Sequence, residues 1–130
     1  MADYLPLFKP GQAFTRAASA TITAGQLVVV SGSGTVAPAG ANAVNWIGVA
    51  AFDAASGADV TILAGGVQRP VASGTVTAGD LVVAGAAGTV ATLAVVTTPT
   101  AADVTNSRAI VGVALTTATT GNLVEVQFDR

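Results

Sequence analysis

Apolar and polar side chains alternate along short stretches of this chain, most clearly near its C-terminal end. In residues 124–129 the alternating side chains are Val124, Glu125, Val126, Gln127, Phe128 and Asp129. Val60 and Ile62 alternate with Asp59 and Thr61 in the same way. A period of two predicts β-strands that have one buried face and one solvated face.

Runs rich in valine and bounded by glycine predict further strands. Two such runs cover residues 26–30 and 81–83, and Gly25 and Gly79 lie just before them. Glycine adopts positive φ at no steric cost, so each of these glycines predicts a tight turn. The segments SGSG and GAAG, which follow the two runs, predict hairpin loops.

Two more strands are predicted at residues 46–52 and 110–115, and each contains one internal glycine, Gly48 or Gly112. An isolated glycine inside a strand predicts a bulge or a close approach of another backbone. No stretch has large apolar residues at helical spacing. Residues 97–107 predict an exposed loop, in which Pro99 allows a single helical turn to follow.

The chain contains two similar sequences in tandem. Residues 11–37 recur as residues 65–91, at a constant offset of 54 residues. Residues 47–62 recur as residues 111–126, where the offset has grown to 64 because the second half carries ten extra residues. The shared positions are strand residues and turn glycines, so the repeat predicts a scaffold.

These patterns together predict an all-β fold, either a compact β-sandwich or a β-tulip or barrel-like domain. At 130 residues the chain is long enough for one domain. We expect an extended arm at residues 1–12 and a single β domain at 13–130, in which copy one spans about 11–64 and copy two about 65–130. The inserted loop of copy two is expected at 97–107.

The N-terminal stretch has the highest density of large apolar side chains. Pro6 and Pro10 oppose a helix and favour extended backbone. An extended apolar arm must pack either on its own domain or on a neighbouring protein. The candidate partner-binding residues are Tyr4, Leu5, Leu7, Phe8, Lys9 and, outside the arm, Trp46.

Trp46 is the single tryptophan and lies in an apolar strand. It is either a buried core residue or an exposed anchor in a protein interface. Arg16 and Arg69 fall at nearly matching places in the two copies. Each is either a contact to a partner or an ordinary surface residue.

Composition narrows the classes of function. Charged residues are 9% of the chain and the formal net charge is −2, which argues against nucleic acid as a partner. The chain has no cysteine and no histidine, so we expect no disulfide, no metal site and no catalytic residue. Asp59 and Glu125 sit near corresponding places in the two copies, and we expect them to be solvated strand residues and not a catalytic pair.

The chain also lacks the signals of a membrane or secreted protein. Its longest apolar runs fall far short of the ~20 residues needed to cross a bilayer. The N-terminal residues do not form a basic region followed by an apolar one, so we expect a soluble protein made in a cytoplasm. We expect no cofactor and no small-molecule substrate.

The chain resembles the capsid decoration, or cement, proteins of tailed bacteriophages. The resemblance rests on an F-x-P-G entry at Phe8 to Gly11, then TAGQLVVV, an Ala/Gly-rich stretch and an IGVA strand followed by a turn glycine and another strand. It covers most of residues 8–64 and, through the repeat, most of 65–130. It implies a β-rich domain that sits as a trimer on the outside of the phage head and clamps adjacent major capsid proteins. The clear duplication departs from the shorter members of that group.

The leading functional hypothesis is therefore a structural protein of the virion, made in the host cytoplasm, that cements adjacent major capsid proteins on the capsid exterior as a homotrimer. The alternative is a phage tail or surface module that recognises a host glycan, although the chain offers few aromatic rings for stacking on sugars. An enzyme is the least favoured class, because neither histidine nor cysteine is present.

Overall fold

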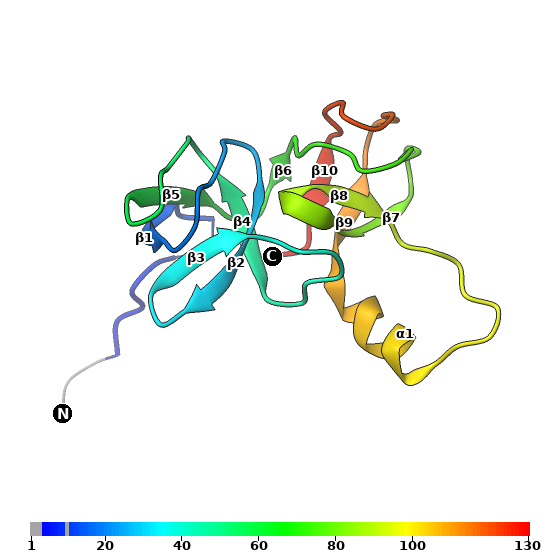
Figure 1. Ribbon diagram of the computed structural model, residues 1–130, viewed down its shortest axis with the longest axis horizontal. Coiled ribbons are helices and arrows are strands. Elements are labelled where there is room, and N and C mark those ends of the chain that lie inside the picture. The colour runs from blue at the N-terminus through cyan, green and yellow to red at the C-terminus, as the bar shows by residue number, and fades with distance from the viewer. Residues whose placement is uncertain (1–3, 10) are drawn as a thin grey trace.

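The fold consists of two β units that lie side by side along the long axis of the molecule (Figure 1). The computed structural model describes residues 4–9 and 11–130. The N-terminal half is a closed barrel and the C-terminal half is a five-stranded sheet. The prediction of an all-β fold is confirmed, and the barrel-like alternative describes the N-terminal half.

The N-terminal half has the strand order β1-β3-β2-β4-β5, with β1 and β3 parallel and the other neighbours antiparallel. Its strands are β1 (Phe14–Ala18), β2 (Leu27–Gly32), β3 (Thr35–Pro38), β4 (Trp46–Ala50) and β5 (Asp59–Leu63). Four of the five follow glycine-bounded or alternating apolar runs. The first strand, β1, lies in a stretch where the pattern predicts none.

The C-terminal half has the order β6-β10-β9-β7-β8. Its strands are β6 (Val67–Gln68), β7 (Leu81–Ala84), β8 (Val90–Thr92), β9 (Ile110–Ala114) and β10 (Val126–Phe128). The short η1 turn (Ala86–Gly88) joins β7 to β8, as the GAAG segment predicts. The last strand is shorter than the alternation of residues 124–129 predicts, because Val124 and Glu125 bond outside a regular ladder.

Strand pairings of the N-terminal half recur in the C-terminal half at the offsets of the sequence repeat. Leu27 pairs with Val49, and Leu81 pairs with Val113. The register slips one step later in both sheets, after Val28 in one and after Val82 in the other. The two halves therefore share their strand geometry down to this irregularity.

Gly48 in β4 and Gly112 in β9 lie where another strand approaches too closely for any side chain. A Cβ on Gly48 would lie 2.5 Å from the carbonyl oxygen of Leu63, and a Cβ on Gly112 would overlap the carbonyl oxygen of Gln127. Both positions are therefore closed to any side chain, which confirms the predicted close approach of backbones. The predicted turn glycines Gly25 and Gly79 have φ of 85° and 94°.

Each half has its own small core, built from matching positions. In the N-terminal half the buried cluster is Ala18, Ile22, Val28, Val36, Ala50, Ala54, Val60 and Ile62. The corresponding buried residues of the C-terminal half are Ala72, Val76, Val82, Val90, Ala114, Ala118, Val124 and Val126. These side chains are small or β-branched, so each core is compact.

A further apolar layer joins the two halves. It belongs to the same cluster as the C-terminal core and combines Leu27, Ala39, Trp46 and Val49 of the N-terminal half with Ala84, Val111 and Phe128 of the C-terminal half. The two halves are thus packed against each other through buried side chains.

The chain between β8 and β9 contains the extra residues of the second half. It runs out as a long loop and returns through α1 (Ala101–Asn106) and the η2 turn (Ser107–Ala109) at the end of the molecule opposite the N-terminal arm (Figure 1). The helical turn expected after Pro99 is present, and α1 extends it slightly. Asp103 accepts hydrogen bonds from Thr100 N and Oγ1 at 2.7 and 2.8 Å, which stabilises the first turn.

Candidate functional site

The N-terminal arm projects from the barrel, and its large apolar side chains are exposed. Tyr4, Leu5 and Leu7 are 89%, 82% and 78% exposed. None of residues 4–9 lies in a helix or strand. Residues 1–3 and 10 of the predicted arm lie outside the described residues. An exposed apolar segment of this density is typical of a surface that binds another protein.

Phe8 is the arm residue that contacts the barrel. Its ring lies 5.4 Å from the ring of Phe14 on β1, between centroids, and Arg16 has its guanidinium carbon 5.6 and 5.3 Å from the Phe8 and Phe14 ring centroids. Lys9 N donates to Gln12 Oε1 at 2.9 Å. These contacts attach the root of the arm to the barrel and leave Tyr4, Leu5 and Leu7 free.

A shallow hollow of about 530 Å³ lies beside the root of the arm. It is lined by Phe8, Lys9, Phe14 and Arg16, together with residues of the chain that links the two halves. Arg130 also lines it, so the hollow combines apolar rings with three cationic side chains. It is wide and open, so it fits a protein segment better than a small molecule.

Trp46 lies apart from the arm and is completely buried between the two halves. Its ring meets the ring of Phe128 edge to face at 5.6 Å between centroids, and the guanidinium carbon of Arg130 lies 4.1 Å from its centroid. Arg130 also donates to Val44 O at 3.1 Å. Trp46 is therefore a buried residue in this chain and not an exposed anchor. The structure does not bring it together with the arm.

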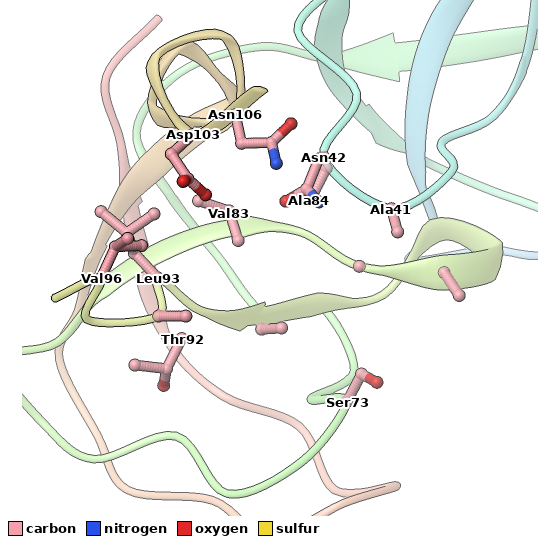
Figure 2. A pocket seen from close by; sticks show the side chains of 14 residues that line it. Ala41, Asn42, Ser73, Val83, Ala84, Thr92, Leu93, Val96, Asp103 and Asn106 are labelled. Carbon is pink, nitrogen blue, oxygen red and sulfur yellow. The ribbon is translucent and has the colours of Figure 1, made fainter. Parts of the chain in front are cut away.

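A second hollow, of about 370 Å³, lies between α1 and the sheet of the C-terminal half. Figure 2 shows Asp103 and Asn106 of α1 facing Val83 and Ala84 of β7 across it. The residues that line it include no aromatic ring. The hydrogen bonds from Thr100 to Asp103 keep the pKa of that carboxyl below its usual value, so it is ionised.

The remaining candidate chemistry does not converge. Asp59 and Glu125 are both exposed. Among residues 4–9 and 11–130, no three acidic side chains lie close enough together to hold a metal ion. The arrangement as a whole is that of a β scaffold with exposed apolar side chains.

Comparison with known proteins identifies the class. The sequence pattern of the family described as phage cement protein matches residues 8–129. The chain therefore belongs to the phage cement protein family and is a capsid-associated structural protein of a phage. Within the described residues, no helix is long and apolar enough to cross a membrane.

One solved structure with a similar fold is that of the head fiber gp8.5 N base in bacteriophage phi29. It superimposes with a TM-score of 0.67 at 20% sequence identity, covering 91% of this chain and 93% of that one. At this identity the likeness establishes the fold. No curated protein matches the chain.

Sequence reasoning misses two features of the surface. Arg130, which covers Trp46, carries no pattern that would single it out. Leu81 and Val113 are exposed on the outer face of the C-terminal sheet although they repeat a buried pair of the N-terminal half. The sequence repeat predicts that the pairs Leu27–Val49 and Leu81–Val113 are equivalent, but it does not predict which of the two pairs is buried.

Proposed function

We propose that this protein decorates the exterior of the phage head and cements adjacent major capsid proteins. In this proposal it acts as a homotrimer, and the arm of residues 1–12 binds the major capsid protein. The remaining residues, 13–130, form a single β domain made of two copies of one unit. Tyr4, Leu5, Leu7, Phe8 and Lys9 are the contact residues.

The observation that carries the proposal is the exposure of the arm. Three of its large apolar side chains contact little of their own domain, while Phe8 and Arg16 hold its root in place. Burial of apolar area contributes about 25 cal/mol per Å². Many copies on one shell multiply a modest gain per contact, which suits a cementing role.

The test is the occupancy of purified phage heads by arm variants. We expect deletion of residues 2–10, or the double substitution Leu5→Asp with Leu7→Asp, to abolish or strongly reduce occupancy. Val95→Asp is a matched control, because Val95 is an exposed apolar residue in the connection between β8 and β9, outside the arm. Full occupancy without the arm would exclude its role, and absence of the wild-type protein from heads would exclude cementing.

The low charge of the chain adds a second readout. Few charges are available for the contact, and apolar contacts are weakly affected by salt. We expect occupancy to change little when salt is raised well above physiological levels. A steep loss of occupancy with salt would point to an electrostatic contact elsewhere on the surface.

The glycan-binding alternative has no comparable support. Sugar sites use aromatic rings for stacking, and the hollow beside α1 is lined by none. In the hollow beside the arm, the rings of Phe8 and Phe14 pack against each other. Selective binding on a glycan array would restore that alternative.

A further inference from the structure

The outer face of the N-terminal barrel is covered by the other half of the same chain. Leu27 and Val49 form a cross-strand pair on this face and are 0% and 5% exposed. They belong to the buried layer that also contains Trp46 and Phe128. This face can be called the outer face of β2 and β4.

The corresponding face of the C-terminal half is open. Leu81 and Val113 form the same cross-strand pair in the same register, and they are 46% and 36% exposed. This outer face of β7 and β9 therefore repeats the residues of a docking surface but has no occupant among the described residues. An uncovered leucine–valine pair on a sheet face is typical of an interaction surface.

The element that covers the outer face of β2 and β4 is one end of the C-terminal half. Ala84, Val111 and Phe128 supply its apolar contacts. The η1 turn packs so closely that a Cβ on Gly88 would lie 2.7 Å from Gln26 Cβ. Gly88 N donates to Ala39 O at 2.8 Å.

Two further hydrogen bonds tie this contact together. Gln26 Nε2 donates to Ala87 O at 3.0 Å, and Asn42 N donates to Ala84 O at 2.8 Å. The contact thus joins an outer sheet face of one half to the turn end of the other. It is head-to-tail, because the two surfaces are different.

The N-terminal half carries the same turn end, and there it is free. Val30 stands in the place of Ala84 and is 46% exposed, while Ile47 stands in the place of Val111 and is partly exposed. Gly34 repeats the φ of Gly88, 75° in both, and a Cβ on it would meet nothing within 4 Å. The chain therefore has one unused outer face and one unused turn end.

We propose that the outer face of β7 and β9 in one chain binds the turn end of the N-terminal half in a second copy of this chain. The occupant is a second copy because the internal contact already joins these two kinds of surface. The free surfaces also lie toward opposite ends of the molecule, the C-terminal half at one end and the barrel at the other (Figure 1).

The inserted loop fits this arrangement. Residues 40–45 of the N-terminal half reach across to Ala84 through Asn42, and the corresponding connection in the C-terminal half is the longer segment that contains α1. In the proposed contact this segment lies beside the turn end of the second copy, where Val30 replaces Ala84. The larger side chain at that position gives the longer loop an apolar surface to contact.

Head-to-tail contacts propagate until they close into a ring or form an open filament. A closed ring would hold the chains of the proposed homotrimer together, so this inference rests on the proposed function for the number of chains. The contact itself can be measured without a capsid, and its failure is therefore distinguishable from failure of cementing.

The experiment is sedimentation velocity of the purified full chain over a range of concentrations. We expect the wild-type protein to associate, and Leu81→Asp to weaken association by about 30-fold or more, as for a central interface residue. Val30→Asp, on the opposite surface, should weaken it similarly. Circular dichroism and thermal unfolding would establish that both variants fold.

Leu123→Asp is the matched control. Leu123 is more exposed than Leu81, pairs with Val71 and not with β7 or β9, and occupies the position where the N-terminal half has Asp59. We expect this variant to associate like the wild type. Equal weakening by this control would overturn the assignment of the contact to Leu81.

Mixing the two variants distinguishes the head-to-tail geometry from a symmetric one. Leu81→Asp chains keep an intact turn end and Val30→Asp chains keep an intact outer face, so an equimolar mixture should form heterodimers that grow no further. No heterodimer, together with an unaffected Val30→Asp variant, would indicate a symmetric contact and overturn the proposal. A wild-type protein that stays monomeric up to about 1 mM would also overturn it and assign the face to a different partner.

Discussion

The pair Leu27–Val49 and the pair Leu81–Val113 have the same residues, the same strand register and the same following irregularity, yet one is buried and the other exposed. The difference does not arise in the strands themselves. It arises because the turn end of the C-terminal half lies on the first pair, whereas nothing in residues 4–9 and 11–130 covers the second. The repeated sequence therefore determines the strand pairing in both halves, but it does not determine whether the resulting sheet face is buried.

The contact between the halves also explains where the two copies diverge. Trp46 and Phe128, which meet edge to face in the layer between them, correspond to Ile110 and Ala64 in the opposite copies. Large aromatic rings thus stand where one half meets the other. The free surfaces carry the smaller Ile110 and Ala64 instead, so the internal contact is the better filled of the two.

The largest difference in the free energy of unfolding is expected between the variants Leu27→Ala and Leu81→Ala. Leu27→Ala should lower the free energy of unfolding by about 2–5 kcal/mol, because it leaves a cavity under the C-terminal half. Leu81→Ala should cost about 1 kcal/mol or less in the dissociated chain, because its side chain is already half exposed. Urea unfolding at low protein concentration measures both, and equal costs would show that the two faces are covered alike.

An intermediate difference in stability is expected between substitutions of the two matching turn glycines, Gly34 and Gly88. Gly34→Ala should cost about 1 kcal/mol, because alanine is strained at a φ of 75° but meets no neighbour. Gly88→Ala should cost about 1–3 kcal/mol more, because its Cβ also collides with Gln26. Thermal unfolding of the two variants measures the difference. Should they prove equally stable, the η1 turn would not pack on the barrel.

The smallest effect is expected for the local stability of α1, which lies in the segment that only the C-terminal half has. The pKa of Asp103 is lowered below 3.8 by its hydrogen bonds from Thr100, so the ionised carboxylate stabilises α1. That stabilisation is fully present above pH 3.8 and is lost as the pH falls through the lowered pKa. The protection factors of the α1 amides, taken relative to the intrinsic exchange rate at each pH, should therefore fall below that pH, while those of the β2 amides stay high.

Asp103→Asn serves as the control for this titration, because it cannot ionise. Its α1 amides should exchange at a rate that no longer depends on the state of residue 103. A wild-type α1 whose protection is unchanged across the acid range would contradict the role of the carboxylate.

Much of the strand pattern was predictable because it depends on local residues. The alternation of Val60 and Ile62 with polar neighbours predicts β5, and Gly25 and Gly79 predict turns that need positive φ. The strands β1 and β6 were not predictable, since Phe14 and Val67 lie in stretches without regular alternation. Their strand conformation comes from pairing with β5 and β10.

The candidate site was predictable only where it depends on local sequence. The apolar arm is visible in the sequence because Pro6 and its neighbours cannot bury themselves in a helix or a sheet. The role of Trp46 was not predictable, because a tryptophan in an apolar strand suits a core and an interface equally well. Its burial follows from Phe128 and Arg130, which are more than 80 residues away.

The sequence by itself determined that the protein is a β scaffold built twice, with an apolar arm and without histidine or cysteine chemistry. Only the tertiary structure decided which outer face is covered, because TAGQLVV and TAGDLVV have nearly the same local preferences. Burial depends on what packs against a surface from elsewhere in the chain. That is why Leu27 lies in the interior and Leu81 remains available to a partner.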